Sequence, residues 1–163
     1  PKRYAGVLEL VKVKSNWGTS TDQKHRGVSS YFCHNTYVAQ VLELTVEAGV
    51  PVVHKVICGI DCGIVVNPDS AKNMAEGGVV DSIGTALYGE LSFENGVPNK
   101  DNFHNYRMIR MKEAPKEIDV YFVENQIAPT GLGEPTYPPT FAALANALHK
   151  ATGKRYYKQP FLS

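Results

Sequence analysis

The chain has 163 residues, and its 17 Lys and Arg against 16 Asp and Glu give a formal net charge of +1. Such a balance supplies no strong positive field and argues against binding to nucleic acid or to an anionic membrane surface. Hydrophobic residues make up 43% and charged residues 20%, which indicates a globular chain and excludes a disordered or fibrous one. No apolar run approaches the roughly 20 residues of a transmembrane helix, so we predict no membrane span.

The N-terminus and the cysteines bear on processing and redox state. The chain begins Pro1-Lys2-Arg3, without Met and without the apolar core of a signal peptide, so we interpret it as a processed product or a piece of a longer protein. A soluble, bacterial-type protein is expected, with cytoplasm and periplasm both left open. The chain has three cysteines, Cys33, Cys58 and Cys62. This number is small and odd, which argues against the disulfide framework of a secreted protein. We expect reduced, mostly buried thiols.

The first predicted element is an amphipathic helix. Its apolar residues recur at helical spacing and the pattern ends at Trp17-Gly18; they are Tyr4, Val7, Leu8 and Val11. The stretch 19–26 has no period and is interpreted as an exposed connector.

Two strands follow. Residues 37–47 alternate between apolar and polar side chains, which predicts a strand with one buried face. Glu47-Ala48-Gly49 is typical of a turn, and the β-branched run 50–60 is expected to pair back antiparallel on the first strand.

A long helix is predicted from Asn67-Pro68-Asp69, which combines a good N-cap, a proline and an acidic residue in the first turn. It is expected to continue to about Tyr88. The pair Gly77-Gly78 lies inside it, where each glycine costs about 1 kcal/mol relative to Ala. The pair therefore indicates a break, or the close approach of another backbone or a ligand.

The remaining elements complete an α+β fold of antiparallel hairpins and about three helices. Asn95-Gly96 predicts a hairpin between 91–93 and Val97. A strand is expected over 118–123, and an Ala-rich helix is expected over 140–152, ending at Gly153. No linker or repeat divides the chain, so residues 1–163 are expected to be a single domain or a fragment of a larger one.

The stretch Gly131-Leu132-Gly133-Glu134-Pro135 is the most informative short motif. Two glycines let the backbone of this loop approach a bound group closely. The loop can then direct the carboxylate of Glu134 toward that group, so Glu134 is a candidate base. The alternative is a glycine-rich turn with a solvated Glu. The motif lacks the third glycine of a dinucleotide-binding fingerprint.

Several motifs in a fixed order make the chain similar to one family. It resembles the C-terminal part of the molybdenum-binding large subunit of the xanthine dehydrogenase and aldehyde oxidase family, of the isoquinoline 1-oxidoreductase β-subunit type. The resemblance covers residues 28–159, and its motifs are Tyr37-Val38-Ala39-Gln40-Val41, Asp61-Cys62-Gly63-Ile64-Val65-Val66-Asn67-Pro68, Glu76-Gly77-Gly78-Val79-Val80, Ala86-Leu87-Tyr88-Gly89-Glu90, Asn102-Phe103-His104-Asn105-Tyr106, Arg110, Glu113-Ala114-Pro115, Gly131-Leu132-Gly133-Glu134-Pro135 and Ala143-Leu144-Ala145-Asn146-Ala147.

The resemblance implies a molybdenum hydroxylase that oxidises an aldehyde or hydroxylates a nitrogen heterocycle, with water as the oxygen source and Glu134 as the general base. It implies a molybdopterin cofactor, in a dinucleotide form, in the full-length protein. Gly131, Gly133, Met74, Glu76, Gly77 and Gly78 would line the cofactor region. The implied partners are the remainder of the molybdenum-binding chain and a [2Fe–2S] iron–sulfur subunit. We expect the isolated chain to bind no cofactor and to be inactive.

One position departs from the family pattern. Met74 stands where the family usually has Gln, and a thioether cannot donate the hydrogen bond of an amide. Three explanations remain open: another group donates the missing hydrogen bond, the cofactor binds differently, or Met74 faces the core.

Other functions receive less support from the sequence. The five histidines lack zinc-ligand spacing, so no protein-built metal site is expected. Cys58 and Cys62 are interpreted as buried hydrophobic residues, and the basic tail 154–158 as a solvated surface or a contact with another chain. A hydrolase that pairs Glu134 with Asp61 or Glu113 has little support. The main rival is a non-catalytic scaffold domain that keeps the fold, for which Met74 is the motivation.

Overall fold

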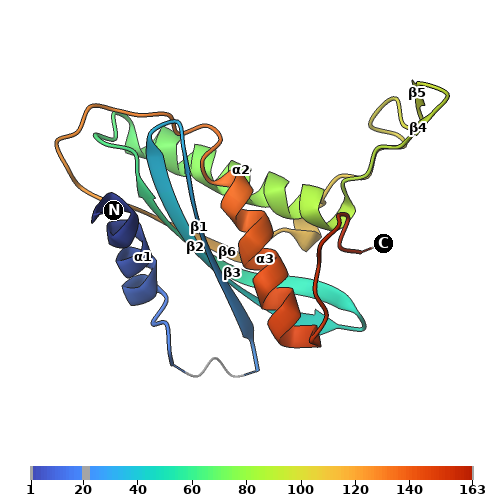
Figure 1. Cartoon of the computed structure of the whole chain (residues 1–163), viewed down its shortest axis with the longest axis horizontal. Coiled ribbons are helices and arrows are strands. Elements are labelled where there is room, and N and C mark those ends of the chain that lie inside the picture. Colours follow the sequence, from blue (N-terminus) through green and yellow to red (C-terminus); the bar gives the residue numbers. More distant parts are fainter. Residues whose placement is uncertain (1, 20–22, 163) are drawn as a thin grey trace.

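The computed structural model describes residues 2–19 and 23–162, which form one four-stranded sheet with helices on both faces (Figure 1). The strand order is β1-β2-β3-β6, and β4 and β5 form a separate two-stranded hairpin. The strands are β1 (His25–Cys33), β2 (Thr36–Glu47), β3 (Val50–Asp61), β4 (Phe93–Glu94), β5 (Val97–Pro98) and β6 (Glu117–Phe122). The helices are α1 (Lys2–Lys14), α2 (Pro68–Tyr88) and α3 (Tyr137–Thr152), with a short 3₁₀ helix η1 (Met111–Glu113). The predicted α+β class with three helices is confirmed.

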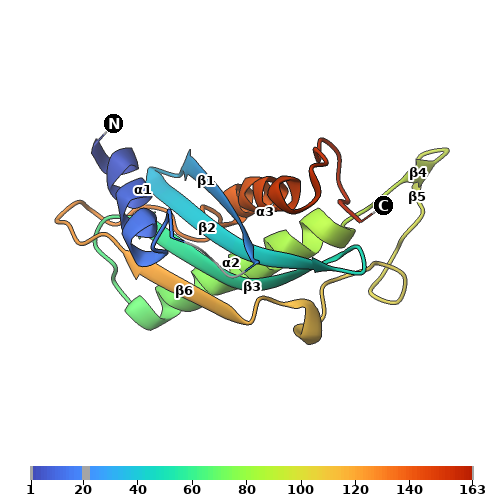
Figure 2. The same cartoon turned by 90° about the horizontal axis from the view of Figure 1, so that it is seen from below.

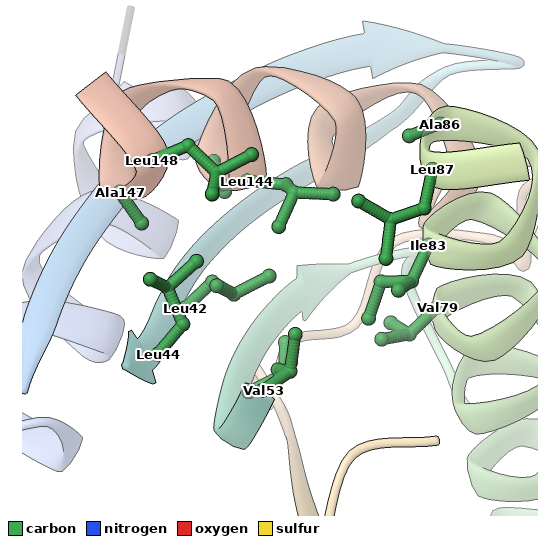
Figure 3. Close-up of a cluster of buried hydrophobic side chains, with 12 residues drawn as sticks. Leu42, Leu44, Val53, Val79, Ile83, Ala86, Leu87, Leu144, Ala147 and Leu148 are labelled. Carbon is green, nitrogen blue, oxygen red and sulfur yellow. The ribbon is translucent and has the colours of Figure 1, made fainter. Parts of the chain in front are cut away.

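The helices divide between the two faces of the sheet. Val7 and Val11 of α1 pack on Ala39, Val41 and Ile57. The opposite face carries the larger core, in which α2 and α3 cover β2 and β3 (Figure 3); its buried members are Leu42, Leu44, Val53, Val56, Val79, Ile83, Ala86, Leu87, Ala143, Leu144, Ala147 and Leu148.

The prediction that β2 has one solvent-exposed face is wrong for most of its length. Residues 38–44 are all buried, because α1 covers the face opposite to α2 and α3. Even Glu43 is only 6% exposed, and its carboxylate pairs with Arg26 at 2.5 Å. Glu43, the first charged residue of the strand, therefore belongs to an internal ion pair, and the polar residues that follow it lie at the end of the strand that reaches solvent.

Strand β1 is an element that the sequence pattern does not predict, since its first residues fall in the expected connector 19–26. It pairs antiparallel with β2 over its whole length. Gly27 lies under α3, where a Cβ atom would collide with the carbonyl oxygen of Ala143. The small residue that permits this close packing also weakens the strand pattern in the sequence.

Strand β6 adds a feature beyond the antiparallel hairpins. It pairs parallel to β3, with α2 inside the long connection between the two strands. The predicted range 118–123 differs from the observed strand by one residue at each end.

The ends of the helices follow local chemistry. The Asn67 side chain caps α2 by accepting a hydrogen bond from the backbone N–H of Ser70, as predicted. Helix α3 begins three residues earlier than predicted, because Pro138 and Pro139 fit in a first turn that needs no N–H donors. Helix α1 ends at Lys14, before the predicted Trp17-Gly18.

The segment between α2 and β6 projects from the sheet. The β4–β5 hairpin turns through Asn95 and Gly96, both with positive φ, as the Asn-Gly signal predicts. In both views it lies at the far end of an arm that leaves the end of α2 (Figures 1 and 2). Its side chains Phe93 and Val97 are 63% and 65% exposed.

Candidate active site

A cavity of about 940 Å³ lies between α2 and the loop that precedes α3. One face of α2 forms a wall of it, and the predicted Gly-x-Gly-Glu loop forms another. Its lining residues are Ser70, Asn73, Met74, Gly77, Gly78, Asp81, Gly133, Glu134, Tyr137 and Pro138. Five of the seven predicted site residues are thus brought to one concavity: Met74, Gly77, Gly78, Gly133 and Glu134.

The two glycines of α2 face different surroundings. A Cβ atom on Gly78 would lie 2.5 Å from Oγ1 of Thr136, so this glycine lets the loop before α3 touch the helix. A Cβ atom on Gly77 would meet nothing within 4 Å. Gly77 therefore leaves open space at the cavity wall, and the helix continues through both residues without a break.

The Gly-x-Gly-Glu loop is fixed to the turn between β1 and β2. The backbone N–H of Gly131 donates to the carbonyl of His34 at 3.1 Å. The hydroxyl of Thr36 donates to the carbonyl of Gly131 at 2.5 Å and lies 2.7 Å from the hydroxyl of Thr130. Gly131 thus holds the loop from outside the cavity and does not line it.

Glu134 lies at the rim of the cavity. Its side chain is 79% exposed, and its Oε2 atom is 2.9 Å from Nε2 of His34, which is itself 56% exposed. The carboxylate is thus both a cavity-lining group and a member of a surface pair. His34 is a site residue that the motifs do not predict; it is 100 positions away in the sequence, and only the docking of the loop on its turn brings the two together.

A buried polar network supports the loop from below. Gln40 on β2 is fully buried; its Nε2 donates to the carbonyl of Thr136 at 2.8 Å, and its Oε1 accepts from the hydroxyl of Thr140 at 2.7 Å. These contacts tie the sheet to the first turn of α3, immediately after Glu134. The Tyr37–Val41 motif therefore supports the site from the sheet side.

Met74 and Glu76 have separate positions on α2. The Met74 side chain is half exposed, and its Cε atom would be 3.3 Å from a Cβ atom on Gly133. It borders the cavity, which removes the option that it faces the core. Glu76 lies off the cavity-lining face, and its carboxylate is 3.6 Å from Nζ of Lys72.

The other acidic candidates have partners of their own. Arg3 forms hydrogen bonds of 2.9 and 2.8 Å with the Asp61 carboxylate, which is the main reason why the pKa of Asp61 lies below its usual value. Burial alone would raise the pKa of Glu113, but its 2.5 Å pair with Arg107 and a backbone hydrogen bond together lower it. Neither Asp61 nor Glu113 lines the cavity, so the hydrolase that pairs one of them with Glu134 gains no support. Asp81 is the carboxylate that lines the cavity together with Glu134.

The cysteines agree with their predicted role. All three are free, Cys58 and Cys62 are buried, and burial raises the pKa of Cys58 to about 12.

Within residues 2–19 and 23–162, no group of three or more His, Cys, Asp or Glu side chains is arranged to hold a metal ion. No helix in the same ranges has the length and apolarity to cross a bilayer.

Residues 5–115 match the model of a molybdopterin cofactor-binding domain family, which is more than half of the chain. The chain belongs to this family. The matched stretch includes most of α1, the three longest strands and α2 with its glycine pair, and it ends before the Gly131–Pro135 loop.

Relatives that match over nearly the whole chain include this loop. The chain is 30% identical to the beta chain of isoquinoline 1-oxidoreductase of Brevundimonas diminuta, over 97% of this chain and 21% of the relative. It is also 30% identical to a membrane-bound aldehyde dehydrogenase of Gluconacetobacter polyoxogenes that is named for pyrroloquinoline quinone, with the same two coverages. The B chain of nicotinate dehydrogenase of Pseudomonas putida is 32% identical over 76% of this chain and 11% of the relative. The predicted resemblance to molybdenum-binding subunits is confirmed, and the chain spans about a fifth or less of these relatives.

Solved structures share the fold. The aldehyde oxidoreductase of Desulfovibrio gigas superimposes with a TM-score of 0.63 at 23% identity, over 77% of this chain and 14% of that one. A Cu,Mo-containing CO dehydrogenase gives a TM-score of 0.64 at 20% identity, over 72% of this chain and 16% of that one. Helices on both faces of a mostly antiparallel sheet are thus the fold of this domain.

Proposed function

We propose that the chain forms part of the large subunit of a molybdenum hydroxylase that oxidises an aldehyde or hydroxylates a nitrogen heterocycle. The observation that carries the proposal is the placement of Glu134 on a glycine loop that lines the same cavity as Gly77 of α2, where a side chain would meet only open space. The names of the relatives support both substrate classes, since one is an aldehyde dehydrogenase and two others are named for isoquinoline and nicotinate.

The residues of the cavity fit one side of an organic cofactor. Gly77 leaves room that a side chain would fill, and the polar groups of Ser70 and Asn73 lie on the same wall as Met74. We propose that this wall, with Gly133, contacts a molybdopterin, in a dinucleotide form, in the full-length protein. When bound, the molybdenum–pterin group accepts the two electrons of the reaction.

Glu134 is proposed as the general base. The overall reaction replaces a C–H bond of the substrate by C–OH, takes the oxygen from water, and releases two electrons and two protons. An exposed carboxylate held at the cavity rim can accept one of these protons as the water oxygen attacks the carbon. General-base assistance of this kind is worth about 10² to 10⁴ in rate.

The proposed partners follow from the same assignment. The rest of the large subunit would close the open side of the cavity, and a [2Fe–2S] subunit would receive the electrons. Among the described residues, no group of three or more His, Cys, Asp or Glu side chains is arranged to hold a metal ion. Gly131 and Glu76, which lie outside the cavity lining, are proposed to act by supporting the loop and the helix.

The test is the origin of the product oxygen. The complete protein, loaded with molybdenum, should oxidise members of a panel of aldehydes and nitrogen heterocycles, with one ¹⁸O atom incorporated from labelled water. A dehydrogenase that uses another cofactor, such as the pyrroloquinoline quinone for which one relative is named, would retain activity after removal of molybdenum. Activity independent of molybdenum contradicts the proposal.

The non-catalytic scaffold is the second candidate, and the His34–Glu134 pair favours it. A carboxylate paired at the protein surface resembles an ordinary exposed ion pair, and Met74 lacks the donor of the family Gln. The scaffold predicts no molybdenum and no oxidation in the complete protein. Replacing Met74 by Gln would then be the first substitution to restore both.

A further inference from the structure

The turn between β1 and β2 places a titratable side chain at its tip. The turn consists of two residues, His34 and Asn35, with φ angles of +50° and +59° between the paired residues Cys33 and Thr36. Such turns usually contain glycine, while Asn and His are among the other residues that enter this region of φ. The tight turn fixes the direction in which the imidazole leaves the backbone.

The backbone of His34 is held by the loop that carries Glu134. A Cβ atom on Gly131 would lie 2.6 Å from the His34 Cβ atom, so the loop can approach the turn this closely only with glycine. The Gly131 N–H donates to the His34 carbonyl, and Thr36 holds the Gly131 carbonyl from the same side. The turn and the Gly-x-Gly-Glu loop therefore form one packed unit.

Within this unit the imidazole of His34 forms a hydrogen bond with one carboxylate oxygen of Glu134. The His34 Nε2 atom lies 2.9 Å from Oε2 of Glu134, and in the described part of the chain no other side chain forms a recorded hydrogen bond with this carboxylate. Both side chains are more than half exposed, so the contact adds little to the free energy of folding. Its effect is on orientation, because a carboxylate on an exposed loop otherwise samples several rotamers.

We infer that His34 is a positioning residue for Glu134: its Nε2–H holds Oε2 and leaves Oε1 to accept the substrate-side proton. The inference rests on the proposed function of Glu134. It assigns to the β1–β2 turn, far from the loop in sequence, a part in the same site.

Two substitutions separate contact from turn geometry. His34→Asn keeps a residue that tolerates the left-handed φ but is too short to reach Glu134. His34→Gln keeps an N–H donor near the position of Nε2. In the complete, molybdenum-loaded protein we expect His34→Asn to lower kcat about 10-fold to 100-fold with little change in KM, and His34→Gln to restore most of the lost kcat.

The control variants distinguish this inference from the proposed function. His104→Ala removes an exposed histidine that pairs with Asp101 on the projecting arm, and it should leave kcat unchanged. In a Glu134→Gln background, His34→Asn should cause no further loss, because both act through one carboxylate. If Glu134→Gln abolishes turnover while His34→Asn equals wild type, the positioning role is overturned and the proposed function stands. If Glu134→Gln leaves turnover unchanged, the proposed function itself fails.

A second readout needs no turnover. In the complete protein prepared without cofactor, diethyl pyrocarbonate should acylate His34 faster in Glu134→Ala than in wild type, as measured by mass spectrometry of the peptide. Acylation of His104 serves as the internal reference and should not change. Equal His34 rates in the two proteins would show that the contact does not hold the imidazole, and would overturn the inference.

Discussion

Two neighbouring glycines of α2 have opposite relations to their surroundings. A methyl group on Gly78 would collide with the Thr136 hydroxyl, whereas one on Gly77 would enter open space. We expect Gly78→Ala to lower the free energy of unfolding by about 1 to 3 kcal/mol through overpacking. Gly77→Ala should raise it by up to about 1 kcal/mol, the helix-propensity difference.

Urea unfolding of the two variants measures this difference directly. Each is the other's control, because both add the same methyl group to adjacent positions of one helix. Equal changes in the unfolding midpoint would contradict the assignment of Gly78 to the contact with the loop and of Gly77 to the cavity.

The Arg3–Asp61 pair predicts a pH-dependent contribution to stability. Asp61 is 2% exposed, and the hydrogen bonds from Arg3 hold its pKa below the usual 3.8. A depressed carboxyl pKa stabilises the fold above the pKa of the unfolded chain, and this contribution is lost as the pH falls through the folded pKa. Arg3→Met should therefore cost about 2 kcal/mol at pH 7, and the difference from wild type should shrink below about pH 4.

Unfolding curves between pH 2 and 7 check this expectation. Lys12→Met, which removes a largely solvent-exposed pair with Glu9, should change stability by less than about 0.5 kcal/mol at every pH. If the loss in Arg3→Met at pH 7 is no larger than in this control, the pair does not hold α1 on the sheet.

Residue identity predicts the site only in part. Glu134 and the glycines around it are expected from their motifs, because the spacing of a short loop is local information. The His34 contact is not, since it depends on β1 pairing with β2 and on the loop folding back over their turn. A turn without glycine at a position of positive φ is the one local signal, and it is visible only once both strands are known.

At the level of elements, the buried amide of Gln40 joins β2 to the start of α3. It donates to the Thr136 carbonyl and accepts from Thr140, and it has no exposure to solvent. Gln40→Leu keeps the approximate volume but leaves these groups without partners, which should lower the free energy of unfolding by about 2 to 3 kcal/mol. The loop that carries Glu134 should also lose order.

Hydrogen exchange measured by mass spectrometry checks both parts, since exchange in residues 130–136 should accelerate along with global unfolding. Asn146→Leu, which removes an exposed amide contact between α3 and the Val28 carbonyl, should change neither by much. Unaltered exchange of the loop in Gln40→Leu would contradict the link between the network and the site.

Patterns of period and capping predict most elements, because α2, α3 and the β4–β5 hairpin depend on local turn and cap chemistry. The missed features are non-local. Strand β1 lacks an apolar period, β2 carries a buried Glu43 that only Arg26 makes tolerable, and the parallel pairing of β6 requires the helix to cross between strands. Each of these features depends on contact with another element that is distant in the sequence, and local patterns do not reveal such contacts.

For the molecule as a whole, the cavity is lined only by α2, the loop before α3 and the first residues of α3, among the residues that the structure describes, and it is open to solvent. Together with a chain that spans about a fifth of its relatives, this predicts that the isolated 163-residue chain neither retains the cofactor nor turns over. Metal analysis of the purified chain should give far less than one molybdenum per chain. Stoichiometric molybdenum would contradict the view that the rest of the large subunit completes the site.

If Glu134 is the base of a molybdenum hydroxylase, turnover should depend on its carboxylate. The most direct test compares wild type with Glu134→Gln in the complete protein and its iron–sulfur partner, at matched molybdenum content, on aldehydes and nitrogen heterocycles. Turnover should fall by about 10² to 10⁴ while the metal is retained. Unchanged turnover in Glu134→Gln would contradict it.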